Sequence, residues 1–412
     1  MGILRRVAEL FSMLLILILS PFVKRRENRI AIGSWSGDRY VDNSRYLMEY
    51  LDASPEDYVL YWVGKKEIRD EVLAHTKRVV FLEINTFRTN LKLLSCKYFF
   101  FSQMHSADIS RSHVYKNAVL CYLHHGMPIK KWAGDGLNQG APQKTWKSRI
   151  KAWLCGTDVP YNYFVTSSPL HDATNCTALA FKGCTAEKNL PAGTPRNDML
   201  IHYDRSFSEE RKRAYADILG FDPSQRVILY LPTYRRISDD VFTFADLSWE
   251  QAERVQALLE EFHAVLIEKS HCAEKKVKQG ISTGNIRFAD AKINVQEMLL
   301  FADVMISDYS GAYLDFALLD RPILHFAYDY EYYKNTDSGL YYDIEDFSAG
   351  EVAYTYDDLI CALRKMLSGE DLYKEKRTYV RKKYMTYEAG NASERIVHEI
   401  IKKEINHEST NS

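Results

Sequence analysis

The stretch Ile306-Ser307-Asp308-Tyr309-Ser310-Gly311-Ala312-Tyr313-Leu314-Asp315-Phe316 indicates the fold of this chain most clearly. An apolar run ends in small polar residues, and a pattern typical of a helix begins directly after them. Backbone N–H groups and the hydroxyl of Ser310 would then lie at the N-terminus of the helix, where an anion such as a pyrophosphate is stabilised. The alternative is an ordinary capped helix with Ser310 as its N-cap.

On both sides of this stretch, β-rich runs alternate with helical patterns such as 42–51, 208–219 and 248–262. Strands that alternate with helices predict parallel sheets with helices on both faces. Two series of strands predict two Rossmann-like domains that face each other across a cleft. The first series is expected at 29–33, 58–63, 79–84, 98–102, 118–123 and 163–166, and the second at 227–231, 264–268, 304–307 and 323–326.

The length of 412 residues also favours two domains, because one core seldom holds that many. We expect an apolar segment at 1–27, Rossmann-like domains at 28–203 and 204–390, and a C-terminal helix and tail at 391–412.

The composition excludes several classes of protein. Hydrophobic residues make up 46% and charged residues 26%, which excludes a disordered chain. Lysine and arginine number 54 against 55 acids, so bulk positive charge for binding nucleic acid is absent. The seven cysteines are scattered without a CxxC pair, which argues against a disulfide framework or a zinc ribbon and favours a reducing compartment.

The segment from Val7 to Val23 is strongly apolar and has basic residues on both flanks. It contains Glu9, is broken by Pro21, and is shorter than the roughly 20 apolar residues of a spanning helix. No small-residue cleavage site follows it. These features favour a segment that lies in the membrane interface; a single span and a buried core helix are the alternatives.

Polar side chains follow several of the expected strands at their carboxyl ends, where open α/β sheets bind ligands. His124-His125-Gly126 follows the run 118–123, and a histidine there could transfer a proton, although a satisfied surface histidine or a metal pair is the plainer interpretation. Adjacent histidines on an extended segment point to opposite sides, so at most one of the two would face the cleft.

Arginines occupy comparable positions. Arg196 in Gly193-Thr194-Pro195-Arg196-Asn197-Asp198 could clamp a phosphate while Asp198 holds it, or it could form an ordinary surface ion pair. Arg235 follows the run 227–231, and Lys269-Ser270-His271 follows the run 264–268. Together these sites suit a nucleotide-diphosphate donor better than any one of them does alone.

With these residues in order, the sequence resembles the CDP-glycerol glycerophosphotransferase family, the teichoic-acid primases and polymerases. The likeness runs from about Ile30 to Tyr384. It rests on His125-Gly126-x-Pro128-x-Lys130, Gly193-x-Pro195-Arg196-x-Asp198, Pro232-Thr233-Tyr234-Arg235, Lys269-x-His271, and Ser307-Asp308-Tyr309-Ser310 continued through Asp315-Phe316 and Arg321-Pro322 to Asp329. The resemblance implies a GT-B architecture, with an acceptor-side domain at 28–203 and a CDP-donor domain at 204–390.

The resemblance also implies roles for single residues. His125 matches the proposed general base of the family, and His271 is counted with it as catalytic. Gly311 replaces the second serine of the family's Asp-Tyr-Ser-Ser run, Ser338 stands where the family has arginine in Arg-Gly-Phe-Tyr, and Cys272 follows the second histidine motif. The implied donor-binding set is Arg196, Thr233, Arg235, Lys269, His271, Ser307, Asp308, Ser310 and Gly311.

The expected function is transfer of glycerol phosphate or ribitol phosphate from a CDP-alcohol to a hydroxyl of a polyprenyl-linked saccharide or polymer. The product would be a teichoic-acid-like wall or capsule polymer, made at the cytoplasmic face of the membrane by a peripheral protein. We expect no cofactor, no nucleic-acid partner and no metal, since Asp308, Asp315 and Asp329 are dispersed. The alternatives are a GT-B glycosyltransferase that uses a nucleotide-diphosphate sugar, and a non-catalytic membrane scaffold.

Overall fold

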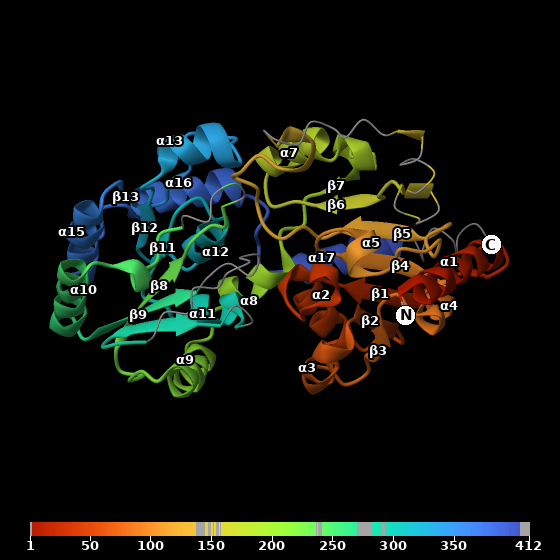
Figure 1. The fold of residues 1–412 in the computed structure, drawn as a ribbon, viewed down its shortest axis with the longest axis horizontal. Coiled ribbons are helices and arrows are strands. Elements are labelled where there is room, and N and C mark those ends of the chain that lie inside the picture. Colours follow the sequence, from red (N-terminus) through yellow and green to blue (C-terminus); the bar gives the residue numbers. More distant parts are fainter. Residues whose placement is uncertain are drawn as a thin grey trace. The chain divides into compact units, whose positions relative to one another are not determined.

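The computed structural model describes residues 2–136, 145–146, 150, 152–153, 156, 158–235, 237, 241–269, 282–290 and 293–403, with side chains from Glu9 onward. Its contacts divide the chain into two compact units, each of which can be followed in Figure 1. The first unit holds residues 1–125, 141–198 and 387–412, and the second holds residues 126–140 and 199–386.

The first unit is built on a parallel sheet of seven strands in the order β3-β2-β1-β4-β5-β6-β7. Its strands are β1 (Arg26–Gly33), β2 (Val59–Gly64), β3 (Val80–Glu83), β4 (Cys96–Phe101), β5 (Val119–Tyr122), β6 (Tyr163–Val165) and β7 (Asn189–Leu190). Its helices include α1 (Gly2–Leu19), α2 (Asp42–Ala53), α3 (Arg69–His75), α4 (Phe87–Leu93), α5 (His105–Asp108), α7 (Pro169–Ala178) and α17 (Ala392–Val397).

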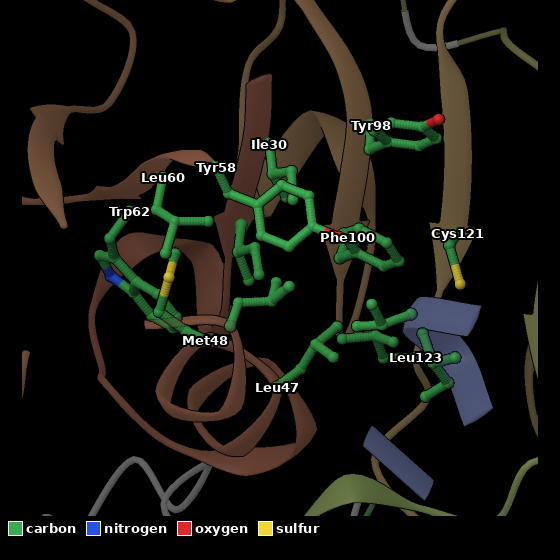
Figure 2. Close-up of a cluster of buried hydrophobic side chains, with 14 of the residues drawn as sticks. Ile30, Leu47, Met48, Tyr58, Leu60, Trp62, Tyr98, Phe100, Cys121 and Leu123 are labelled. Atoms are coloured by element: carbon green, nitrogen blue, oxygen red, sulfur yellow. The ribbon is translucent and has the colours of Figure 1, made fainter. Parts of the chain in front are cut away.

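Alternate residues of these strands form the core of the first unit. Figure 2 shows Ile30, Leu60 and Phe100, from three neighbouring strands, in one cluster with Leu47 and Met48 of α2. All five side chains are at most 1% exposed. The three strand residues lie on the same face of the sheet, because side chains along a strand alternate between its two faces.

The C-terminal helix belongs to the same core. Ile396 and Val397 of α17, and Ile400 and Ile401 of the π-helical turn that follows, are buried in the cluster of the first sheet. The segment expected as a separate end at 391–412 therefore groups with the first unit, as far as the structure describes it. The contacts likewise place the loop after His125 in the second unit rather than within a domain 28–203.

The second unit is built on a parallel sheet of six strands in the order β10-β9-β8-β11-β12-β13. Its strands are β8 (Arg226–Leu231), β9 (Ala264–Lys269), β10 (Ile286–Ala289), β11 (Val304–Ser307), β12 (Ile323–Phe326) and β13 (Glu351–Ala353). Its helices include α9 (Arg205–Leu219), α10 (Trp249–Glu261), α11 (Val295–Phe301), α12 (Ala312–Ala317), α13 (Tyr330–Tyr332), α14 (Ile344–Phe347), α15 (Tyr356–Leu367) and α16 (Lys374–Tyr384), while α8 (Asp198–Ile201) begins at the last residue of the first unit's central segment.

Both strand orders contain the same reversal of direction. The chain moves outward from β1 to β3 and then returns to place β4 on the other side of β1; β8, β9, β10 and β11 repeat this path. In doubly wound sheets, ligands bind at the carboxyl ends of the strands beside such a reversal. The expected α/β fold with parallel sheets is confirmed, and the arrangement of two domains across a cleft stays a prediction.

The apolar N-terminal segment forms α1, which contacts α4. Ile16 is fully buried, whereas Leu10, Phe11, Leu14 and Ile18 are between 46% and 63% exposed. Among the described residues, no helix is long and apolar enough to cross a membrane.

Arg25, one of the basic residues that follow this segment, has a structural role. Its guanidinium donates to the carbonyl oxygens of Leu93, Cys96, Val114 and Lys116 at 2.5–3.1 Å. Burial lowers its pKa to about 10. Arg25 thereby ties the start of β1 to two other segments, so it does not add to a basic surface, unlike the exposed Lys24 and Arg26.

Candidate functional site

His125 lies directly beyond the carboxyl end of β5 and is exposed to solvent. Its Nδ1 lies 3.4 Å from the carbonyl oxygen of Ser102, which follows β4. A carbonyl oxygen only accepts, so this contact places the proton on Nδ1 and leaves Nε2 as the basic nitrogen. This is the tautomer that a general base needs when it takes a proton through Nε2.

The neighbouring His124 points into the protein, so one histidine of the pair is exposed as expected, although the φ angle of 63° at His124 is not that of an extended strand. It is 1% exposed, and its Nε2 lies 2.9 Å from the side-chain oxygen of Asn175 on α7. Burial, with the nearby His171, holds the pKa of His124 well below its ordinary value. His124 is therefore neutral, and the exposed His125 is the member of the pair that can meet a substrate.

His171 on α7 packs edge-on against His124, with ring centroids 4.3 Å apart. The backbone N–H of Ser167 donates to its Nδ1 at 3.2 Å, which fixes the proton of this ring on Nε2. Burial lowers the pKa of His171 to about 3. A layer of neutral imidazoles thus lies behind His125.

Arg196 lies beside His125 in the first unit. Its Nη1 donates to the carboxylate of Asp42 and to the carbonyl oxygen of His125, both at 2.8 Å. The carboxylate that holds Arg196 is therefore Asp42, whereas the expected partner Asp198 accepts from the backbone N–H groups of Ala392 and Ser393 at the start of α17. The phosphate-clamping role of Arg196 stays a prediction.

In the second unit, Arg235 is the centre of a buried network at the carboxyl end of the sheet. Its guanidinium donates to Asp308 at 2.9 Å and to Asp329 at 2.8 and 3.0 Å, and also to the carbonyl oxygen of Thr233 and the hydroxyl of Tyr328. These contacts occupy all five of its N–H groups. The side chain is fully buried, and its guanidinium carbon lies 4.7–5.6 Å from the rings of three tyrosines, Tyr309, Tyr328 and Tyr333.

Asp308, directly after β11, carries the opposite charge in this network. Its carboxylate accepts from the backbone N–H of Thr233 at 2.9 Å and from the hydroxyl of Thr233 at 2.5 Å. Burial alone would raise its pKa, but Arg235 and these hydrogen bonds hold the pKa below its ordinary value. The pair is therefore ionised on both sides, and Asp308 joins the ends of β8 and β11.

His325 on β12 supports the backbone at Asp308, where the turn to Ser310 begins. The backbone N–H of Ala349 donates to its Nε2 at 3.0 Å, so the proton lies on Nδ1, which faces the carbonyl oxygen of Asp308 at 3.3 Å. Burial lowers the pKa of His325 to about 4. Its neutral ring fixes the peptide that leads into Tyr309 and Ser310.

Ser310 and Gly311 are the half-exposed residues of this turn. The N-cap of α12 is Gly311, one residue later than expected, and the hydroxyl of Ser310 accepts from the backbone N–H of Ala312 at 3.3 Å. A Cβ atom at Gly311 would lie 3.0 Å from the carbonyl oxygen of Met127, a tight contact that glycine avoids. The turn thus presents the hydroxyl of Ser310 and a glycine backbone that the carbonyl oxygen of Met127 approaches closely.

Comparison with known proteins identifies the family. The family model described as CDP-glycerol:poly(glycerophosphate) glycerophosphotransferase matches residues 15–402. The chain belongs to this family. The resemblance seen in the sequence is thereby confirmed.

Two relatives of this family member match it along most of its length. The chain is 26% identical over 388 residues to a teichoic acid poly(glycerol phosphate) polymerase of Bacillus spizizenii. That alignment covers 92% of this chain and 93% of the relative. The chain is 26% identical over 392 residues to a teichoic acid glycerol-phosphate transferase of Staphylococcus aureus, with 91% and 93% covered.

Two solved structures share the fold. The wall teichoic acid polymerase TagF matches with a TM-score of 0.76 at 19% identity, over 98% of this chain and 95% of that chain. A UDP-GlcNAc 2-epimerase of Neisseria meningitidis matches with a TM-score of 0.54 at 12% identity, over 91% and 99%.

The structure brings together four of the expected donor-side residues of this family member: Thr233, Arg235, Ser307 and Asp308 are all buried at the carboxyl ends of β8 and β11. Lys269 ends β9 and is 4% exposed. His271, expected to be catalytic, lies outside the described residues, so its role stays a prediction.

The departure from the family at Ser338 lies in a loop paired with the histidine motif. Lys130 and Leu340 form an antiparallel bridge, and the backbone N–H of Tyr341 donates to the carbonyl oxygen of Ile129 at 2.9 Å. The hydroxyl of Tyr341 donates to Asp135 at 2.6 Å. Within the second unit, the residues after His125 are therefore anchored to the loop 338–341.

Sequence reasoning missed two groups of residues at the site. Asp42 and Asn43, which contact Arg196, lie at the start of α2 after β1, a position that the carboxyl-end rule covers. The tyrosines around Arg235 gave no such signal, because a Tyr-rich stretch is equally typical of a core. Among the described residues, no group of three or more His, Cys, Asp or Glu side chains is placed to hold a metal ion.

Acidification is expected to destabilise the chain through its buried neutral histidines. Burial lowers the pKa of His171 from 6.5 to about 3, so between these pH values the unfolded state binds a proton that the folded state does not. The free energy of unfolding therefore falls as the pH drops from about 6.5 towards 3. His171→Gln should reduce the loss between pH 7 and pH 5 by roughly 1–2 kcal/mol.

Urea denaturation at each pH measures this difference, and the same substitution at the exposed His75 is the control. An equally steep decline in His171→Gln and in the wild type would contradict the assignment of a neutral His171.

Proposed function

We propose that this chain transfers a phosphoalcohol, glycerol phosphate or ribitol phosphate, from a CDP-alcohol to a hydroxyl of a membrane-linked saccharide or polymer. The product is a teichoic-acid-like polymer of the wall or capsule, and the acceptor is polyprenyl-linked. The family match over residues 15–402 and the relatives that make or transfer poly(glycerol phosphate) support this proposal.

The observation that carries the proposal is the state of His125. It is an exposed histidine at the carboxyl end of a parallel strand, with Nδ1 facing a carbonyl oxygen. That arrangement leaves Nε2 to accept a proton, the chemistry that activation of a hydroxyl requires. A scaffold that only binds nucleotide has no need of such a group.

In the proposed reaction, Nε2 of His125 takes the proton of the acceptor hydroxyl as its oxygen attacks the distal phosphorus of the donor. The bond from that phosphorus to the bridging oxygen breaks, and CMP leaves with the bonding electrons. The products are the phosphodiester of the acceptor and CMP, and the proton passes from His125 to solvent. Positioned donors around the phosphate oxygens lower the barrier by stabilising the charge that develops there.

On the donor side, we assign contact with the pyrophosphate to the turn at Ser310 and Gly311. Both residues are half-exposed, and Gly311 adds no side chain to the turn. Arg235 does not contact the pyrophosphate itself, because its five N–H groups already bind Asp308, Asp329, Thr233 and Tyr328. Its role is to fix the turn rather than to clamp phosphate.

Release of CMP from CDP-glycerol or CDP-ribitol, with a lipid-linked acceptor analogue, tests the proposal. The wild type should release CMP only when acceptor is present. His125→Ala should lower kcat by about 10²- to 10⁴-fold, as loss of a general base does, while the dissociation constant for the donor stays within about threefold. His75→Ala, a change at another exposed histidine of the first unit, is the control and should keep the wild-type rate.

Two outcomes would contradict the proposal. Loss of donor binding in His125→Ala would remove the base assignment. Release of UDP from a UDP-sugar, without turnover of either CDP-alcohol, would make the chain a glycosyltransferase of the same fold.

We further propose that α1 attaches the protein to the cytoplasmic face of the membrane as a peripheral protein. Leu10, Leu14 and Ile18 lie one turn apart on α1 and are 46–61% exposed, while Ile16 packs inward. The exposed Lys24 and Arg26 follow and would be attracted to anionic headgroups. An apolar helical face beside basic residues is typical of a helix that lies in the interface.

Flotation with vesicles that contain phosphatidylglycerol tests this attachment. Leu14→Glu should reduce the bound fraction at least severalfold, because a carboxylate would enter the apolar layer. Ile218→Glu is the matched control, since Ile218 is an exposed apolar residue (68%) on α9 of the second unit. Equal binding of Leu14→Glu and the wild type would contradict the role of α1.

A further inference from the structure

Three consecutive carbonyl groups at the histidine motif are held by side chains from other segments. Asn43 donates both of its amide hydrogens, one to the carbonyl oxygen of Leu123 and one to that of His124, each at 3.0 Å. Arg196 donates to the carbonyl oxygen of His125 at 2.8 Å. The backbone that carries the base is therefore fixed at every residue from 123 to 125.

Asn43 is itself held at its other polar atoms. Its backbone N–H donates to the carboxylate of Asp42 at 2.9 Å, and its side-chain oxygen accepts from the backbone N–H of Arg196 at 3.2 Å. The same carboxylate accepts from the guanidinium of Arg196. The side chain of Asn43 is fully buried. Asp42, Asn43 and Arg196 thus form one closed network around the segment that ends in His125.

This segment needs support because its backbone is strained. His124 has a φ angle of 63°, in the left-handed region, which costs a residue other than glycine on the order of 1 kcal/mol. Gly126, on the other side of the base, has a φ angle of 121°. Without external hydrogen bonds, the segment would relax towards an ordinary extended conformation and carry the ring of His125 with it.

A carboxamide suits this position better than any other group of its size. It supplies two N–H donors and one acceptor in a plane, and the two carbonyls and the N–H of Arg196 use all three. A carboxylate has the same shape but no donor, so it would face two carbonyl oxygens with repulsion instead of hydrogen bonds.

We propose that Asn43 is a positioning residue for the base, an inference that rests on the proposed function. It fixes the peptides from which His125 projects, so that the ring keeps its contact with the carbonyl oxygen of Ser102 and stays aimed at the acceptor hydroxyl. Asn43 acts through the backbone of the base and takes no part in donor binding. Its loss should therefore lower the rate of transfer and leave the affinity for the CDP-alcohol unchanged.

The test is CMP release by Asn43→Asp in the full-length chain. A displacement of a reacting group by about 1 Å costs on the order of 10²-fold in rate, so kcat should fall by about that factor. The KM for CDP-glycerol should stay within about threefold of the wild type, because the interaction lost acts only on the base. A variant with the wild-type kcat, or with kcat intact and KM raised, would overturn the inference.

Asn90 provides a matched control for the loss of a buried amide. It is 2% exposed in the same unit, on α4, and its side chain is hydrogen-bonded to Ser110 and Ser112. Asn90→Asp should lower the thermal stability and keep the kcat of the folded fraction. If Asn43→Asp does not fold, Asn43→Ser, which keeps one donor, should show the same loss of kcat to a smaller degree; a wild-type rate in Asn43→Ser would then overturn the inference.

A second readout separates this inference from the proposed function. The imidazole signals of His125 can be identified in ¹H–¹⁵N spectra by their disappearance in His125→Ala. Asn43→Asp should shift these signals, and Asn90→Asp should not. If the wild type transfers no phosphoalcohol, the proposed function fails while the spectra still decide the role of Asn43; unmoved signals in Asn43→Asp would overturn that role.

Discussion

The ion pairs of Arg235 with Asp308 and Asp329 join the loops that follow β8, β11 and β12. Without these ion pairs, each loop would be a separate connection at the carboxyl end of the sheet. Because the guanidinium is fully buried, removal of either carboxylate would leave N–H groups of Arg235 without an acceptor, at a cost of about 1–3 kcal/mol, even though the other carboxylate still balances its charge. This network also fixes the position of the turn at Ser310 and Gly311. The turn follows Asp308 closely and leads into α12. In the proposed function, the donor side of the site therefore depends on a charge cluster that does not itself touch the ligand.

In the first unit, a different set of buried side chains fixes the loop that carries the exposed residue of the site. There Asp42, Asn43 and Arg196 hold the strained segment that presents His125, as Arg235 and its acids hold the turn at Ser310. In both units, buried charged or amide side chains hold the backbone that presents the exposed or half-exposed residues. Such preorganisation lowers the barrier because little has to move when charge develops in the transition state.

Much of this architecture could be predicted from the sequence, and the exceptions have physical reasons. The central strands were predictable because they are continuous apolar runs, whereas the edge strands β7 and β13 have two and three residues and no such run. The exposure of only one histidine of the pair was predicted, but the reason given for it was wrong, because His124 has a left-handed φ angle of 63° and follows two buried residues, Tyr122 and Leu123. The sequence could not tell whether Arg235 binds a phosphate or an acid, because its partner Asp329 lies 94 residues away. Arg196 presents the same ambiguity, and its partner Asp42 lies 154 residues away.

A crystal structure of the chain with CDP-glycerol bound would show directly which groups contact the pyrophosphate. We expect the pyrophosphate to lie against the hydroxyl of Ser310 and the backbone at Gly311, with the ion pairs of Arg235 to Asp308 and Asp329 intact. A pyrophosphate bound directly by the guanidinium of Arg235, with those ion pairs broken, would contradict this expectation.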